Sequence, residues 1–223
     1  MPLARADVRD VCFAHWPVDP DGLAPVVPAA LAPATRDGSA WMSVLAQRTR
    51  AGLGGLPGRY EFPQVACRTY VVPADSDDRS EEDAVGVFFL RVAAPSRFAT
   101  LGGRIVFGIP YIRAPVDFER TGESIRVRAE SGGGTARYDA SFAPERDPTP
   151  ADPDSLDAWL TERYRYYLPD GRYGEIGHEP WRLATATGAI EDTELLDTVG
   201  VEPSDDPLLR YSPGTDVRLT RRA

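Results

Sequence analysis

Hydrophobic and polar positions alternate in short runs along most of the chain, and this pattern predicts many strands and few helices. A nearly continuous apolar run such as residues 85–92 is typical of a strand inside a sheet. Turns rich in glycine, proline and aspartate separate the runs. The expected strands cover residues 11–18, 40–50, 64–72, 85–92, 111–118, 124–129, 135–142, 164–168, 172–175 and 181–190. We therefore expect a mainly β (α+β) fold of the closed-barrel or sandwich type.

Local signals predict a hairpin turn and a few short helices. The Asp37-Gly38 pair is typical of a tight hairpin turn. Asp19 before Pro20 predicts a helix start, and Ser96 is a candidate N-cap for a helix over residues 96–107. Residues 155–160 are expected to form a helix that leads into a strand. A short acidic helix is expected over residues 191–199.

The charge composition limits the classes of partner that the protein is expected to bind. The chain has 34 acidic and 25 basic residues, and its net charge of -9 argues against a nucleic-acid partner. All 25 basic residues are arginine, because the sequence contains no lysine. This bias fits GC-rich coding, or the acidic, lysine-poor surface of a halophile's proteins. Both explanations concern the habitat of the source and leave the function open.

The sequence shows no signal for export or for a membrane span. It contains no apolar run of about 18 residues, and residues 1–7 lack the apolar core of a signal peptide. Cys12 and Cys67 are far apart in the sequence, and we expect them to be free and buried. A cytoplasmic protein without a membrane partner is therefore expected.

Seven separated segments together resemble the YqjF-like family of uncharacterised proteins, within the acetoacetate decarboxylase-like superfamily. They are His15-Trp16-Pro17-Val18-Asp19, Asp37-Gly38-Ser39-Ala40-Trp41, Arg68-Thr69-Tyr70-Val71, Phe107-Gly108-Ile109-Pro110-Tyr111, Leu160-Thr161-Glu162-Arg163-Tyr164, His178-Glu179-Pro180-Trp181 and Tyr211-Ser212-Pro213-Gly214-Thr215-Asp216-Val217. No single segment is specific, but their order follows the family. The resemblance implies a cone-shaped β-barrel with a few helices packed against it and an enclosed pocket, as one domain over residues 1–223. The proline-rich stretch 144–153 is the best candidate for a linker.

The resemblance also shows what the chain has lost. Gly108-Ile109-Pro110-Tyr111 resembles the Gly-x-Pro-Lys segment that carries the Schiff-base lysine of acetoacetate decarboxylase, and Tyr111 stands at the lysine position. A chain without lysine cannot form a side-chain imine with a keto acid. Family members often read Pro-Glu-Leu-Asn where this chain has Gln64 in place of the glutamate. Gln64 cannot act as an acid or base, but it can form hydrogen bonds.

Strand alternation groups the candidate site residues. It places Arg68 and Tyr70 on one face of a strand, and Tyr111 and Arg113 together on another. If these faces converge inside the barrel, arginine would bind a carboxylate and tyrosine would supply a phenol and a flat apolar wall. The alternative is that these side chains face solvent. The expected ligand-binding set is Gln64, Arg68, Tyr70, Tyr111, Arg113 and His178.

The histidines and cysteines carry little further chemistry. His178 either contacts a ligand at the cavity mouth or satisfies a turn with its ring nitrogens, and the second reading is favoured. His15 is expected in the core or at the rim. These residues are too few and too scattered for a metal site, and no motif calls for a cofactor.

Three functions are compatible with these observations. The favoured one is a barrel that binds a small anionic or aromatic organic molecule without Schiff-base chemistry. The second is an imine-independent lyase or isomerase acting on a small carbonyl acid, with Tyr111 as the acid or oxyanion donor. The third is an assembly protein whose barrel is filled by inward residues such as Trp41, Phe88 and Phe89. The resemblance leaves a homo-oligomer open.

Overall fold

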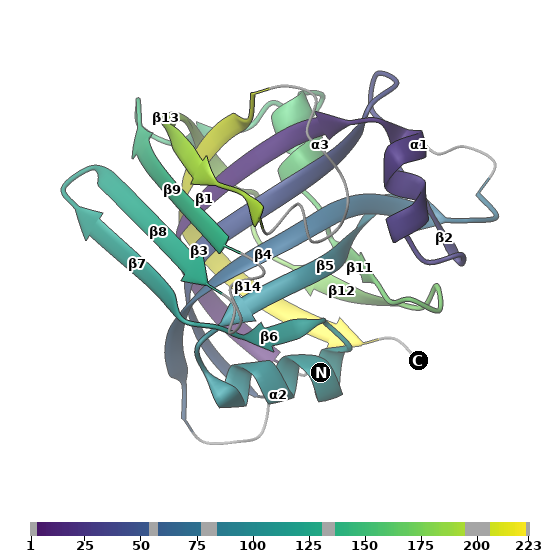
Figure 1. Ribbon diagram of the computed structural model, residues 1–223, viewed down its shortest axis with the longest axis horizontal. Coiled ribbons are helices and arrows are strands. Elements are labelled where there is room, and N and C mark those ends of the chain that lie inside the picture. Colours follow the sequence, from purple (N-terminus) through teal and green to yellow (C-terminus); the bar gives the residue numbers. More distant parts are fainter. Residues whose placement is uncertain (1–3, 54–57, 77–83, 131–136, 195–205, 222–223) are drawn as a thin grey trace.

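A closed β-barrel forms the centre of the protein, shown by a computed structural model that describes residues 4–53, 58–76, 84–130, 137–194 and 206–221 (Figure 1). Seven of the described strands make up its wall. In spatial order they are β1 (Ala4–Val18), β3 (Ala40–Leu53), β4 (Tyr60–Pro73), β5 (Gly86–Ala94), β11 (Arg165–Tyr167), β12 (Tyr173–Gly177) and β14 (Leu208–Arg221). The barrel closes because β1 pairs with β3 on one side and β14 on the other. The expected closed-barrel fold is confirmed.

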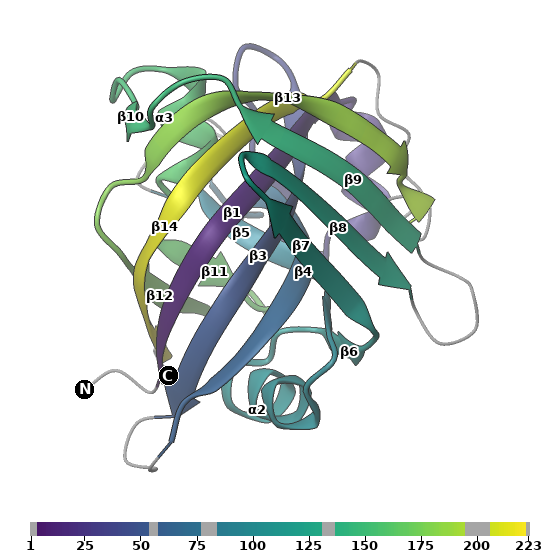
Figure 2. The same cartoon turned by 90° about the vertical axis from the view of Figure 1, so that its left-hand side faces the viewer.

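A second layer of strands folds over the outside of the barrel, in front of β1, β3 and β4 (Figure 2). It contains β13 (Arg182–Asp192), β9 (Arg137–Pro144), β8 (Ser124–Glu130) and β7 (Val116–Thr121), in that order. β13 also pairs with β14, so this layer continues the barrel sheet. The short strands β2 (Leu31–Pro33), β6 (Tyr111–Arg113) and β10 (Thr149–Pro150) pair with β4, β5 and β13, respectively.

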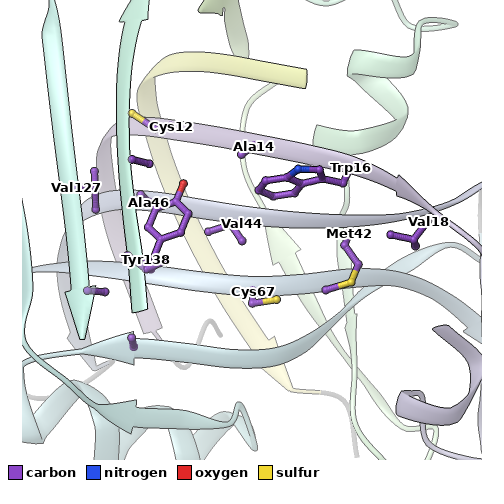
Figure 3. Packing of buried hydrophobic residues seen from close by; sticks show 14 of the residues in the cluster. Cys12, Ala14, Trp16, Val18, Met42, Val44, Ala46, Cys67, Val127 and Tyr138 are labelled. Carbon is purple, nitrogen blue, oxygen red and sulfur yellow. The ribbon is translucent and has the colours of Figure 1, made fainter. Parts of the chain in front are cut away.

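A hydrophobic core fills the space between the barrel and this outer layer (Figure 3). Cys12, Val44 and Cys67 point outward from the barrel, and Val127 and Tyr138 meet them from β8 and β9. The resemblance implied a few helices packed against the barrel. Strands instead cover the outward face of β1, β3 and β4, because β8 and β9 are themselves apolar on alternate residues and present that face inward.

Three short α-helices accompany the described strands. In α1 (Pro20–Leu23), which a 3₁₀ turn η1 (Ala24–Val26) extends, the Asp19 carboxylate caps the first turn by accepting from the Asp21 N–H at 3.1 Å. The Ser96 hydroxyl caps α2 (Arg97–Phe107), and the Ser155 hydroxyl caps α3 (Leu156–Thr161). These starts confirm the caps predicted at Asp19 and Ser96. In both views α3 lies at the upper end of the barrel and α2 at the lower end (Figures 1 and 2).

Several element boundaries differ from the sequence prediction. β1 begins at Ala4, because charged residues there still pair within the sheet. The strand expected over residues 111–118 divides into β6 and β7, and Pro115 between them has no N–H for a ladder. The acidic helix expected from residue 191 is wrong at its start, since β13 continues to Asp192; residues 195–199 lie outside the described part. The predicted Asp37-Gly38 turn is confirmed by positive φ at both residues.

Both cysteines are free and buried, as expected. Burial raises the pKa of the Cys67 thiol to about 12, although nearby Arg91 lowers it slightly. Burial also raises the pKa of Cys12. Both are therefore protonated thiols at neutral pH and behave as small apolar side chains. Among the described residues, no helix combines the length and apolarity that a membrane crossing demands.

A buried carboxylate joins the barrel to the outer layer. Asp10 lies at a bulge in β1 with a φ of 50°, and its side chain is only 8% exposed. It accepts hydrogen bonds from Arg48 of β3, from Arg120 of β7 and from the Tyr211 hydroxyl of β14. Burial by itself raises the pKa of this carboxyl, but the three donors outweigh burial and hold the pKa below its ordinary value of 3.8. One side chain thus connects four strands.

We expect Asp10→Asn to lower the free energy of unfolding by about 1–3 kcal/mol, because two arginines lose their anionic partner while remaining partly hydrated. The folded-state pKa is depressed, so this stabilisation is complete above the unfolded pKa and disappears as the pH falls through the folded value. Urea unfolding between pH 2 and 7 measures both effects. The Asp216→Asn control removes a carboxylate that is 77% exposed and should change stability by less than about 0.5 kcal/mol. Equal effects for the two variants would contradict the assignment.

Candidate functional site

The inward face of β4 carries the polar residues that alternation predicted. Ala66 and Tyr70 pack in the core inside the barrel, while Val65, Cys67 and Val71 pack in the core outside it. Gln64 and Arg68 share the inward face with Ala66 and Tyr70. The structure therefore places Gln64, Arg68 and Tyr70 inside the barrel. Whether they bind a ligand stays a prediction.

Strand register arranges the interior in layers across the barrel. The upper polar layer, defined as His15, Ser43, Arg68 and Tyr70, lies near α3. His15 pairs with Ser43, and Ser43 pairs with Arg68, so these side chains are neighbours across β1, β3 and β4. An apolar layer follows below it and consists of Phe13, Leu45, Ala66 and Val92.

The lower polar layer, defined as Gln47, Gln64 and Tyr111, lies near α2. Gln47 pairs with Gln64 across β3 and β4, and the Tyr111 hydroxyl donates to Gln64 Oε1 at 3.0 Å. Gln64 and Arg68 are four residues apart on one strand, which separates their backbones by about 13 Å at ~3.3 Å per residue. An apolar layer therefore lies between Arg68 and Tyr111, and the structure places the two in different layers of the barrel.

Tyr111 packs directly beneath α2. A Cβ on Gly103 would overlap the Tyr111 ring, so only glycine allows the helix to approach so closely. The residue as a whole is partly exposed, but burial of its hydroxyl raises the pKa of Tyr111 to about 12. At neutral pH Tyr111 is thus a neutral phenol that donates a hydrogen bond to Gln64, where the resemblance would place a lysine.

The two remaining predicted site residues lie elsewhere. Arg113 is exposed at the end of β6, so the structure does not bring it to the interior. The His178 ring is nearly fully buried in the wall, stacked on Tyr164 and close to Trp181. Its Nδ1 lies 2.9 Å from the Glu179 carbonyl oxygen, which agrees with the turn-satisfying role favoured from the sequence. Burial lowers the pKa of His178, although backbone hydrogen bonds and Glu162 partly oppose this.

The upper layer holds a guanidinium without a counter-ion in the described part of the chain. Arg68 is 7% exposed, and its Nη2 donates to the Leu160 carbonyl at 3.1 Å. Its Nε has no hydrogen-bond partner, and no described carboxylate forms an ion pair with it. An unpaired buried charge is costly. Polar atoms in this position are therefore candidates for ligand contacts.

A pocket opens in the barrel wall beside β5. This strand pairs with β11 at Val87 and with β6 from Val92 to Ala94. Between these pairings, residues 88–91 have no strand on that side in the described part of the chain. A cavity of about 390 Å³ occupies the gap. Its lining combines apolar side chains with one cation, and the residues are Val26, Phe88, Phe89, Leu90, Arg91, Gly108, Ile109, Pro110, Tyr167, Leu168 and Pro169.

Arg91 is a site residue that the sequence analysis did not select. It is partly buried, and no ion pair links it to a described carboxylate. The available signal was an arginine inside the apolar run 85–92. The sequence does not show that β5 has a bulge at Leu90. This bulge shifts the β4–β5 register between the Cys67–Arg91 and Arg68–Phe89 pairs, and the placement of Arg91 depends on it. Phe89 points inward and Phe88 outward, so only Phe89 contributes to the filled interior.

The candidate site holds no evident metal centre: within the described ranges, no three His, Cys, Asp or Glu side chains form a group that could hold a metal ion. The seven-stranded barrel and its outer strands have the fold of solved acetoacetate decarboxylase-like proteins. The fold matches the acetoacetate decarboxylase of Legionella pneumophila subsp. pneumophila str. Philadelphia 1 with a TM-score of 0.69 and 15% identity, over 99% of this chain and 86% of that one. It also matches an enduracididine biosynthesis enzyme, MppR, complexed with pyruvate, with a TM-score of 0.67 and 14% identity, over 98% and 89% of the two chains. At such identity the likeness shows the fold alone.

Sequence similarity gives the family. The DUF2071 family of uncharacterized conserved proteins matches residues 5–216. The uncharacterized protein YqjF of Bacillus subtilis (strain 168) is 37% identical over 224 residues, which cover 96% of this chain and 89% of that protein. The chain belongs to this YqjF-like family, as the segment resemblance predicted.

We expect Gly103→Ala to destabilise the protein relative to Gly102→Ala by about 1–3 kcal/mol, because the new methyl group collides with the Tyr111 ring. Both substitutions give the helix the same gain in propensity of about 1 kcal/mol, so their difference isolates the collision. Thermal unfolding measures this difference. If both variants were equally stabilised, Tyr111 would not pack against α2 as described.

Proposed function

We propose that the protein binds a small organic anion in the wall pocket beside β5, without Schiff-base chemistry. The observation that carries this proposal is Arg91, a cation that lines an otherwise mostly apolar cavity of about 390 Å³. Pockets for small ligands commonly span ~300–1,000 Å³ and combine apolar walls with a few polar groups. A carboxylate on an aromatic or short aliphatic body has this chemistry.

The similar proteins support an acid as the ligand. The structure of MppR contains pyruvate, a small carboxylate, and shares this fold. The segment Gly108-Ile109-Pro110 forms part of the wall pocket and leads directly into Tyr111. Without lysine anywhere in the chain, a keto acid bound here cannot be held as a side-chain imine. Recognition therefore depends on the charge of Arg91 and on apolar contacts.

Benzoate and benzamide form a matched pair of probes, since they differ in charge but hardly in shape. We expect benzoate at ten times its Kd to stabilise the fold by about 1.4 kcal/mol, which raises Tm by about 3–6 °C. Arg91→Met should weaken benzoate binding about 10- to 100-fold, because it removes a charge-assisted hydrogen bond. Differential scanning fluorimetry and isothermal titration calorimetry measure these effects.

The control is Arg104→Met, which removes an exposed arginine from α2 and should leave benzoate binding unchanged. Benzamide should produce little shift in any variant. Equal binding of benzoate and benzamide, or unchanged benzoate affinity in Arg91→Met, would show that Arg91 does not recognise an anion. Absence of any shift with benzoate and with aliphatic carboxylates from acetate to hexanoate would remove the proposed function itself.

A second candidate is imine-independent catalysis on a small carbonyl acid. The observation that favours it is the neutral, buried Tyr111 phenol held by Gln64. To donate to a developing enolate oxygen, the phenol would redirect its one proton from Gln64 Oε1 to the ligand. Gln64 cannot exchange a proton, so it would orient the phenol and leave proton removal to another group.

Exchange of the pyruvate methyl protons in D₂O tests this second candidate by NMR. If the protein catalyses enolisation, exchange will exceed the rate in buffer, and Tyr111→Phe should slow it by a factor on the order of 100. Arg113→Met, which removes an exposed arginine from the same short strand, should retain the full rate. Exchange no faster than in buffer would leave binding as the function.

A further inference from the structure

The hydrogen bonds of the upper polar layer have a fixed direction. The Tyr70 hydroxyl donates to the Leu160 carbonyl at 2.8 Å, because a carbonyl oxygen can only accept. Tyr70 has then used its one hydroxyl proton, so Ser43 must donate across their 2.7 Å contact. Ser43 has likewise used its own proton, and His15 Nδ1, at 2.6 Å, must donate to Ser43. The order is His15 to Ser43 to Tyr70 to Leu160.

This order determines which ring nitrogen of His15 carries the proton. His15 is fully buried, and burial, with Arg68 and Arg210 nearby, holds its pKa well below the ordinary value. The ring is therefore neutral, with its proton on Nδ1. Nε2 then presents a lone pair, and no described residue donates a hydrogen bond to it. The barrel interior contains a buried acceptor without a donor.

Two buried donors lie on the same inward surface. Arg68 flanks Ser43 opposite His15, and its Nε has no partner among the described residues. Trp41 is two residues before Ser43 on β3 and packs in the same inner core. Its indole Nε1 also has no described partner. The upper polar layer and the adjoining Trp41 thus present two N–H donors, one of them cationic, and one acceptor that have no hydrogen-bond partner among the described residues.

We propose that the upper polar layer binds a small hydroxy acid, with Arg68 holding the carboxylate and His15 Nε2 accepting a hydrogen bond from the hydroxyl. The guanidinium fork matches a carboxylate, which takes two parallel hydrogen bonds. A hydroxyl on the neighbouring carbon supplies the proton that His15 lacks. Trp41 adds a donor to the same group of oxygens. A simple carboxylic acid anion satisfies Arg68 but leaves His15 Nε2 without a partner.

This site is distinct from the wall pocket. Arg91 pairs with Cys67, whose side chain points out of the barrel, whereas Arg68 points into it. Phe89 connects the two regions, since it lines the wall pocket and pairs with Arg68 across β4 and β5. The two sites can be tested separately with Arg91→Met and Arg68→Met.

The tautomer of His15 gives the first test. The chain has only two histidines, so multiple-bond ¹H–¹⁵N NMR of the wild type, with His178→Gln for assignment, resolves each ring. We expect the His15 proton on Nδ1 and an unprotonated Nε2. Tyr70→Phe removes the acceptor of the Ser43 proton, so Ser43 can donate to His15 and the proton should move to Nε2. A wild-type ring already protonated on Nε2 would overturn the proposal.

Glycolate and acetate give the second test, because they differ by one hydroxyl group. NMR titration of the wild type should show glycolate binding on the order of tenfold more tightly than acetate, with the largest shift at His15 Nε2. Tyr70→Phe should reduce the ratio of glycolate affinity to acetate affinity. Arg68→Met should abolish the shift of His15 Nε2 with both acids, while binding at Arg91 in the wall pocket remains. Arg91→Met should preserve the glycolate preference, which separates this site from the proposed function.

Each other outcome argues against the hydroxy-acid site. Equal affinities for glycolate and acetate would show that His15 Nε2 does not accept a hydrogen bond from the hydroxyl group of the ligand. No saturable shift with either acid would show that water alone satisfies the layer. If Arg68→Met fails to fold, the tautomer shift in Tyr70→Phe and the wild-type preference still decide the question.

Discussion

Closure of the barrel through β1 is the constraint on which the rest of the structure depends. β1 pairs along its length with β3 and β14, and its Asp10 bulge anchors the outer layer through Arg48, Arg120 and Tyr211. Closure of the barrel gives each of its strands an inner and an outer face. Inward polar side chains must then find partners inside the barrel or present unsatisfied atoms to a ligand.

Some inward polar side chains find partners inside the barrel and others do not. This difference determines which groups a ligand can contact. Near α2, Tyr111 and Gln64 satisfy each other, so the position that resembles the Schiff-base lysine segment carries a neutral hydrogen-bonded pair. Near α3, Arg68 and His15 keep unpartnered nitrogen atoms within the described part of the chain. The wall pocket adds a third environment, where Arg91 lies among apolar side chains. In this lysine-free chain the barrel interior thus contains a guanidinium, that of Arg68.

The sequence predicted features that depend on neighbours in the chain. Alternation placed Arg68 and Tyr70 on one face of a strand but left open whether that face was inward, which the structure decides. The caps at Asp19 and Ser96 and the Asp37-Gly38 turn were predicted from local signals. The sequence could not predict the apolar layer that separates Arg68 from Tyr111, since register across four strands decides it. It also missed Arg91, because the gap between β6 and β11 arises from pairings distant in sequence. Arg113 shows the limit of alternation at a short strand end.

A crystal structure of the protein grown with saturating benzoate would test whether the wall pocket binds an organic anion. We expect density for benzoate in the pocket between β6 and β11, with its carboxylate within hydrogen-bonding distance of the Arg91 guanidinium and its ring against Phe88 and Leu90. An empty wall pocket under these conditions, or a benzoate bound away from Arg91, would contradict the account.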